Sequence, residues 1–163
     1  MFFPTSHLPP LTSRIEGDET MINPEDIFLH RAPFLFVDEV IEMKYLESSK
    51  GKKIVKDDEF WVEGHFPNNP IFPGVILLET MAQIGGLILM DMEGDQKTLN
   101  AYLSKVDKFK LIKKVVPGDE VIVEGTFLDQ IGDFTTVKTK AFVNGAKVAE
   151  AKITYVSRDE LEG

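Results

Sequence analysis

The chain has 163 residues, of which 43% are hydrophobic and 28% charged, and it carries a formal net charge of −9. This length predicts one compact domain, and the composition excludes a wholly disordered chain and a multi-span membrane protein. The absence of cysteine excludes a disulfide scaffold, a cysteine nucleophile and a thiolate zinc site, and the acidic balance argues against a nucleic-acid-binding protein.

The first twenty residues differ in composition from the rest of the chain. They hold three prolines among serines and threonines and show no helical or strand periodicity, so we interpret residues 1–20 as an extension. Two interpretations stay open: a flexible tail, or an arm that packs on a partner subunit. Residues 21–163 form the predicted domain, and Met21 is a candidate native start. Asn23 followed by Pro24 predicts a helix N-terminus, because asparagine caps helices and proline is favoured at their first position.

The most apolar stretch, residues 71–90, has about the length of a membrane span. It contains Glu79, and a carboxylate near the middle of a span is costly, so we predict a helix buried in the protein core instead. We expect this helix to run from Gly74 to about Met92 and, because it is apolar on nearly every side, to be covered all round. With no span and no secretory signal pattern, the expected location is the cytoplasm.

Strand-like segments stand on both sides of this helix. They are rich in β-branched residues and are separated by turn signals, of which Asn144-Gly145 is the clearest hairpin signal. They predict an α+β arrangement: an antiparallel sheet of about five to seven strands, the last four in a meander, curled around the central helix. The expected strands are residues 34–43, 52–55, 60–62, 99–110, 120–129, 134–143 and 147–157.

The segment from residue 64 to residue 79 carries a pattern that suits acid–base chemistry. Three prolines in seven residues make a stiff, extended loop between His65 and Gly74. Glu79 is the one charged residue of the apolar stretch, and desolvation favours the protonated form that a general acid requires. Free backbone N–H groups near Gly74 and Val75 are placed to hold a carbonyl oxygen that gains negative charge.

Gln83 lies one helical turn after Glu79 and therefore on the same face. Gly86 continues this stripe, and we expect it to leave room for a ligand or another helix. His65 as base, Glu79 as acid and the backbone donors would together remove water from a β-hydroxy thioester. Each residue alone has a plainer interpretation: His65 as a structural or surface histidine, and Glu79 as an exposed residue or the ion-pair partner of a lysine.

These residues resemble 3-hydroxyacyl-[acyl-carrier-protein] dehydratases of the FabZ type. The motifs are His-Phe-Pro-x-x-Pro-x-x-Pro-Gly from His65, Leu-Glu-x-Met-Ala-Gln from Leu78 and His-Arg-Ala-Pro-Phe-Leu-Phe-Val-Asp from His30, with Lys-Phe-Lys from Lys108 and Val-Pro-Gly-Asp from Val116 downstream. The resemblance implies a hotdog fold and a homodimer, in some members a trimer of dimers. It also implies acyl carrier protein as the partner that presents the substrate on its phosphopantetheine arm, with no metal and no diffusible cofactor.

The resemblance also assigns roles to individual residues. It implies that His65 of one subunit and Glu79 of the other are catalytic, and that glutamate rather than aspartate at this position gives dehydration without isomerisation. The substrate-binding residues expected with them are Gly74, Val75, Gln83 and Phe66. Two positions depart from the family pattern: Asn68 replaces a glycine, and Ala32 replaces a tyrosine or phenylalanine. Both bear on substrate choice more than on the chemistry.

Five lysines lie within ten residues and are opposed in that stretch by Asp107 alone. They form either a basic patch that steers an acidic partner or a strand edge on which lysines deter aggregation. The resemblance favours docking of acyl carrier protein. The five are Lys105, Lys108, Lys110, Lys113 and Lys114.

The leading prediction is thus dehydration of a (3R)-3-hydroxyacyl-[acyl-carrier-protein] in fatty acid biosynthesis. Three alternatives remain open at this stage. They are a dehydratase of a specialised polyene or polyketide pathway, a hotdog acyl thioesterase, and a non-catalytic subunit that binds an acyl carrier. The sequence leaves acyl chain length open.

Overall fold

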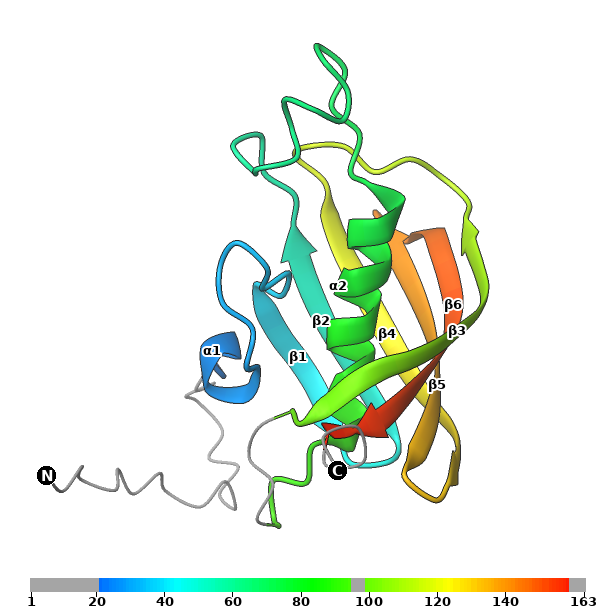
Figure 1. Ribbon diagram of the computed structural model, residues 1–163. Helices are drawn as coiled ribbons and strands as arrows, with labels where there is room; N and C mark the ends of the chain where they lie inside the picture. Colours follow the sequence, from blue (N-terminus) through cyan, green and yellow to red (C-terminus); the bar gives the residue numbers. More distant parts are fainter. Residues whose placement is uncertain (1–20, 95–98, 159–163) are drawn as a thin grey trace, which may run out of the picture.

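The computed structural model describes residues 21–94 and 99–158, and Figure 1 shows a sheet curled around the helix α2. The predicted extension, residues 1–20, lies outside the described residues. The sheet has six strands in the order β1-β2-β4-β5-β6-β3, and every neighbouring pair is antiparallel. The strands are β1 (Glu39–Lys44), β2 (Ser48–Ile54), β3 (Ala101–Leu111), β4 (Glu120–Ile131), β5 (Phe134–Val143) and β6 (Ala146–Ser157); the helices are α1 (Pro24–Ile27), α2 (Gly74–Gly86) and the 3₁₀ helix η1 (Leu87–Leu89).

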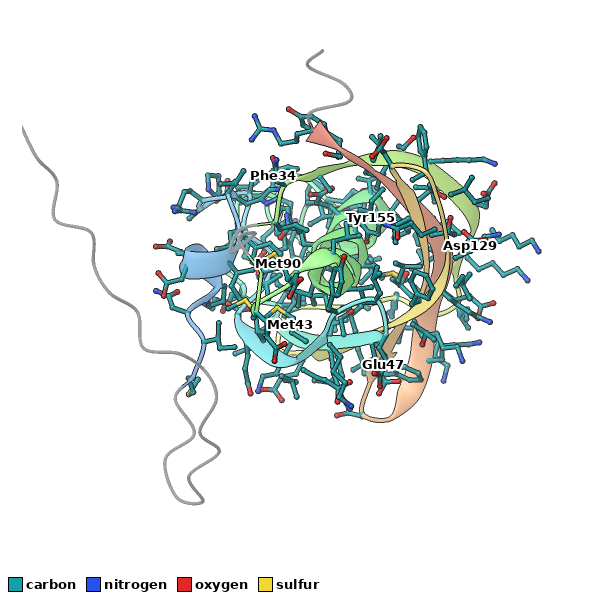
Figure 2. The ribbon with its side chains drawn as sticks, turned by 90° about the horizontal axis from the view of Figure 1, so that it is seen from below. Phe34, Met43, Glu47, Met90, Asp129 and Tyr155 are labelled. Atoms are coloured by element: carbon teal, nitrogen blue, oxygen red, sulfur yellow. The ribbon has the colours of Figure 1, made fainter. Side chains whose placement is uncertain are left out.

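The core lies between α2 and the concave face of the sheet. Side chains of β5 alternate between the two faces, with Val137 and Ala141 buried and Lys138 exposed, as expected for a half-buried strand. From α2, Leu77 and Met81 are fully buried against this face. Figure 2 shows α2 end-on inside the curved sheet, and this enclosure confirms the predicted α+β hotdog fold.

The first helix and the last hairpin match their sequence signals. Asn23 accepts a hydrogen bond from the Glu25 N–H over 3.1 Å and so caps α1, with Pro24 in the first turn. Asn144 and Gly145 have φ angles of 50° and 77° and join β5 to β6, as a two-residue turn of this kind requires.

The helix α2 is shorter than predicted. It ends at Gly86 rather than near Met92 and continues only as the 3₁₀ helix η1. Two consecutive glycines weaken helix propensity at this point by about 1 kcal/mol each. In addition, the Ile88 carbonyl accepts the Leu46 N–H over 2.9 Å, so this carbonyl is engaged outside the helix.

Two predicted strand segments are wrong in part or in whole. Residues 34–38 form a loop before β1, since Phe34 O and Phe36 N bond to the Gln83 side chain and not to a neighbouring strand. Residues 60–62 form turns, because Val62 N and His65 N bond to carbonyls three and four residues earlier in the chain. Their apolar side chains indicated burial, and the period-2 pattern was too short to distinguish a strand from a buried turn.

The predicted four-strand meander holds only for β4, β5 and β6. The strand β3 pairs with β6 and lies at the edge of the sheet, so residues 112–119 must cross to reach β4. In the described part of the chain, no helix combines the length and apolarity needed to cross a membrane.

Candidate active site

His65 lies within the turn-rich segment between β2 and α2. Its backbone N–H donates to Trp61 O over 3.0 Å, and Trp61 packs on the buried Phe72 with ring centroids 5.4 Å apart. The ring nitrogen Nδ1 lies 2.7 Å from Ile71 O, and the ring stacks on Phe66 at 4.2 Å between centroids. Contacts within one loop therefore fix both the position and the tilt of the imidazole.

The proline-rich loop after His65 accommodates its departure from the family pattern. Asn68 has a φ of 58°, in the left-handed region that asparagine tolerates better than most non-glycine residues. Two hydrogen bonds of 3.0 and 2.9 Å between the backbones of Phe66 and Asn69 close the turn around it. The backbone thus takes the conformation that a glycine would allow, and the effect on substrate choice stays a prediction.

The start of α2 presents free donors, as a helix N-terminus does. Pro73 O accepts from Ile76 N and Leu77 N at 3.0 and 2.9 Å, whereas the N–H groups of Gly74 and Val75 bond to no group in the described part of the chain. The Val75 side chain is 75% exposed, so ligands have access to this end of the helix.

Glu79 and Gln83 lie on one face of α2, as their spacing predicts. Gln83 Nε2 donates to Glu79 Oε1 over 3.0 Å and to Phe34 O over 2.9 Å, and Gln83 Oε1 accepts the Phe36 N–H over 2.9 Å. Because both N–H groups of the amide are used inside the chain, Gln83 orients Glu79 and anchors the loop of residues 34–36. Its predicted contact with substrate is untested.

The stripe does not continue to Gly86 as expected. A Cβ atom at Gly86 would lie 2.9 Å from Leu99 and 3.4 Å from Tyr155, so these side chains already fill the space. Tyr155 is a buried neighbour of this stripe that sequence reasoning did not select. Its hydroxyl donates to Ala82 O over 2.6 Å; burial raises its pKa well above the ordinary value, and the nearby charge of Glu79 adds to this rise.

Within one chain, His65 and Glu79 have separate partners. His65 contacts Ile71 and Phe66, whereas Glu79 contacts Gln83 and, at 3.6 Å, Nε2 of His30. No hydrogen bond or ion pair joins His65 to Glu79 among the described residues. His30 is a second residue beside the site that sequence reasoning did not select.

The predicted docking lysines are all exposed, but the fold divides them. Lys105 lies 3.3 Å from Asp107, and Lys110 stands opposite Glu150 of β6. The strand β6 adds both signs of charge here, because Glu150 is paired with Lys147 over 2.6 Å and Lys152 stands opposite Asp107.

Two of these lysines lie closer to the start of α2. Lys113 and Lys114 follow β3, directly before Val115, whose carbonyl accepts the Phe72 N–H over 2.8 Å. This bond holds the loop against the residues that precede Gly74. The docking role remains a prediction for all five lysines.

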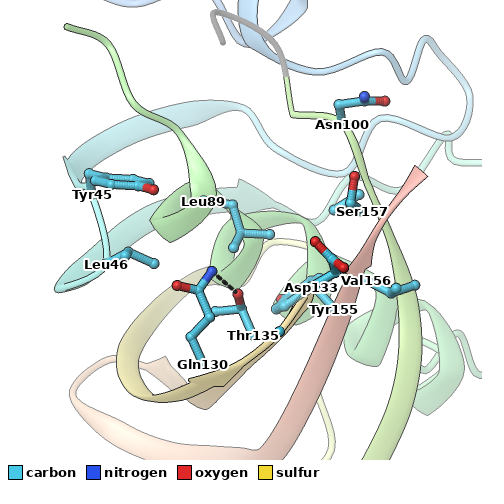
Figure 3. Close-up of a pocket in the computed structure, with 12 residues that line it drawn as sticks. Tyr45, Leu46, Leu89, Asn100, Gln130, Asp133, Thr135, Tyr155, Val156 and Ser157 are labelled. Atoms are coloured by element: carbon cyan, nitrogen blue, oxygen red, sulfur yellow. Dashed lines mark hydrogen bonds between the residues drawn. The ribbon is translucent and has the colours of Figure 1, made fainter. Parts of the chain in front are cut away.

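One cavity lies away from the predicted site residues, and another lies on the loop that Gln83 anchors. A cavity of about 240 Å³ lies where Gln130, Thr135 and Tyr155 meet, and Gln130 Nε2 donates to Thr135 Oγ1 over 3.2 Å there (Figure 3). None of the predicted site residues lines it. A more open cavity of about 490 Å³ is lined by Ala32 and Phe36, on the loop that Gln83 anchors.

Comparison with known proteins places this geometry in a family. A FabA-like domain matches residues 28–152. The chain is 40% identical over 137 residues to the 3-hydroxyacyl-[acyl-carrier-protein] dehydratase FabZ of Enterococcus faecalis, covering 84% of this chain and 96% of that protein. It is 38% identical over 139 residues to the FabZ of Campylobacter lari, covering 83% and 95%.

Solved structures share the architecture. The dehydratase heterocomplex ApeI:P from Xenorhabdus doucetiae superposes with a TM-score of 0.72 at 16% identity, covering 86% of this chain and 95% of that one. The class of the protein is therefore that of FabA-like hotdog domains. Within this class, the extent of the match to curated relatives shows that the chain belongs to the FabZ family of 3-hydroxyacyl-[acyl-carrier-protein] dehydratases.

Proposed function

We propose that this chain is a hydro-lyase that converts (3R)-3-hydroxyacyl-[acyl-carrier-protein] to the trans-2-enoyl form in fatty acid synthesis. The observation that carries the roles is the 2.7 Å contact between His65 Nδ1 and Ile71 O. A carbonyl oxygen only accepts, so the neutral imidazole keeps its proton on Nδ1 and a lone pair on Nε2. That lone pair is what a general base needs.

The reaction balances with two protein groups and no cofactor. Nε2 of His65 takes the proton from C2, the electrons of that bond form the C2–C3 double bond, and the C3–O bond breaks. Glu79 gives its proton to the departing hydroxyl, which leaves as water. The resulting carboxylate and imidazolium then return to their starting states by transferring one proton from His65 to Glu79.

The N–H groups of Gly74 and Val75 support the same assignment. In this proposal they donate to the thioester carbonyl oxygen, which gains negative charge while C2 loses its proton. The helix dipole adds to this stabilisation, because the N-terminus of α2 is its positive end. Phe66 stacks on His65, and in this proposal it lines the approach to the base.

The proposal places each active site between two chains of a homodimer, with His65 from one subunit and Glu79 from the other. Their separate partners within one chain support this arrangement. The edge strand β3 supports it too, because in the described part of the chain it pairs with β6 alone and exposes Leu103 and Leu111, a combination that favours association. The partner that presents the substrate is acyl carrier protein, and the compartment is the cytoplasm.

The test follows formation of the enoyl thioester from 3-hydroxybutyryl-acyl carrier protein. The variants His65→Ala and Glu79→Gln should each lose at least about a hundredfold in kcat, the usual contribution of a general acid or base. Free thiol is measured in the same reactions. Its release without enoyl product would indicate a thioesterase, and near-full dehydration by either variant would contradict the assigned roles.

A further inference from the structure

His30 lies beside the proposed acid, 49 residues away in sequence. Its Nε2 atom is 3.6 Å from Oε1 of Glu79, and the same oxygen accepts the Gln83 amide over 3.0 Å. Two nitrogens therefore converge on one carboxyl oxygen. Oε2 of Glu79 has no hydrogen-bond partner in the described part of the chain.

The surroundings of the His30 ring determine where its proton sits. The ring stacks on Phe34 at 6.3 Å between centroids and meets Phe28 edge-on at 6.2 Å. Its Nδ1 atom is buried without a partner among the described residues. An unpaired buried N–H is rarer than an unfilled lone pair, so this environment favours the tautomer with hydrogen on Nε2. Nε2–H then faces Glu79 as a donor.

The backbone around His30 is held as firmly as its ring. The Arg31 guanidinium donates to Phe28 O over 2.8 Å and to His30 O over 2.7 Å. Gln83, only 2% exposed, bonds to both Phe34 O and Phe36 N on the far side of the loop. The imidazole is thereby kept at Glu79 before any substrate binds.

We propose that His30 is a positioning residue for Glu79, an inference that rests on the proposed dehydratase function. Gln83 donates to Oε1, and in this proposal the Nε2–H of His30 does so too once substrate is bound, so that the acid proton resides on Oε2, the oxygen left to face the leaving hydroxyl. A contact of 3.6 Å is longer than a hydrogen bond, and catalytic contacts of this kind tighten when substrate binds. His30 thus acts through Glu79 and does not touch the reacting atoms.

The test distinguishes the packing of the His30 ring from the hydrogen bonding of its nitrogens. His30→Phe keeps the stacking on Phe28 and Phe34 but removes both nitrogens, and His30→Gln returns an N–H donor near the Nε2 position. For His30→Phe we expect kcat to fall about tenfold, with KM for 3-hydroxybutyryl-acyl carrier protein within about twofold and an unchanged melting temperature. His30→Gln should recover kcat to within about threefold of the wild type.

A spectroscopic readout accompanies the kinetics. In ¹⁵N-histidine spectra of the whole protein, the His30 resonances, identified by their loss in His30→Phe, should show the Nε2–H tautomer. Either an Nδ1–H tautomer or full kcat in His30→Phe would overturn the positioning role. If Glu79→Gln still loses activity in the same experiment, the proposed dehydratase function stands without it. Absence of dehydration by the wild type overturns the proposed function and this inference together.

Discussion

Glu59 shows how a single carboxylate organises the segment that carries His65. It is partly buried and accepts hydrogen bonds from Lys56 N, Lys53 Nζ and Trp61 Nε1 at 2.8, 2.9 and 3.0 Å. Burial alone raises the pKa of Glu59, but these three hydrogen bonds and the charge of Lys53 outweigh it, so the pKa is lowered overall. The backbone carbonyl of Trp61 also accepts the His65 N–H, so this network helps to fix the position of His65, the proposed base.

The substitution Glu59→Gln should destabilise the fold by about 2 kcal/mol at pH 7, because charge-assisted hydrogen bonds to a partly buried group are lost. The native pKa lies below the unfolded value of about 4.3, so this stabilisation is complete above that pH and is lost as pH falls through the native pKa. Urea unfolding between pH 3 and pH 7 should therefore show the wild type and Glu59→Gln converging at the acidic end.

A surface carboxylate provides the control for this experiment. Glu42 also has a lowered pKa, caused chiefly by its hydrogen bond from Ser48, but its side chain is 40% exposed. Glu42→Gln should cost no more than about 0.5 kcal/mol at pH 7, as expected for a solvated site. Equal losses at both positions would contradict a special role for the Glu59 network.

At the scale of elements, close approach between α2 and the sheet depends on glycine. A Cβ atom at Gly85 would lie 2.7 Å from both Thr139 Cγ2 and the Tyr155 hydroxyl, and one at Gly125 would lie 3.3 Å from the Gly85 Cα. Distances below 3.0 Å require a shift of neighbouring atoms. The helix therefore rests on the sheet at a distance that only these glycines permit.

Gly85→Ala should destabilise the protein by about 1–2 kcal/mol, since overpacking costs about 1–3 kcal/mol and better helix propensity offsets up to about 1 kcal/mol. The matched control is Gly74→Ala in the same helix, where the added Cβ meets only Leu111 at 3.6 Å, an ordinary contact. Thermal unfolding should show a lower midpoint for Gly85→Ala alone. A rise at both positions would mean that helix propensity outweighs packing.

Local signals predicted the elements that depend on local physics. The strand Phe134–Val143 and the Asn144-Gly145 turn match their sequence patterns, because alternation and turn conformation are set by neighbouring residues. The end of α2 and the loop of residues 34–38 could not be predicted, since they depend on hydrogen bonds to Leu46 and Gln83 that only the folded chain brings together.

The candidate site also combines contacts that the sequence predicts with contacts that arise only in the folded chain. The spacing of Glu79 and Gln83 predicts their contact, because four residues make one helical turn. His30 carries no such signal: its contact with Glu79 arises from the tertiary fold. The catalytic and binding roles assigned to the predicted site residues remain predictions, for which the structure supplies positions and partners.

Across the whole molecule the charge is negative, so the proposed docking of an acidic acyl carrier protein would depend on local positive charge. The loop with Lys113 and Lys114 is tied to the start of α2 by the hydrogen bond from Phe72 N to Val115 O. Lys105 lies six residues before the end of β3, about 20 Å away along an extended strand, and beside Asp107. Lys113 and Lys114 therefore lie nearer the proposed substrate entrance than Lys105 does.

The double variant Lys113→Glu/Lys114→Glu should therefore lower kcat/KM for 3-hydroxybutyryl-acyl carrier protein about tenfold at low salt, since reversed charges slow electrostatic encounter. The corresponding pantetheine thioester lacks the carrier, so its turnover should be unchanged. The control Lys105→Glu/Lys138→Glu makes the same change of charge on exposed sites away from α2, and it should lose less than about twofold. Added salt should narrow the difference between wild type and the first variant, because it screens the attraction. Equal losses in both double variants would show that the carrier responds to overall charge and not to a docking site beside α2.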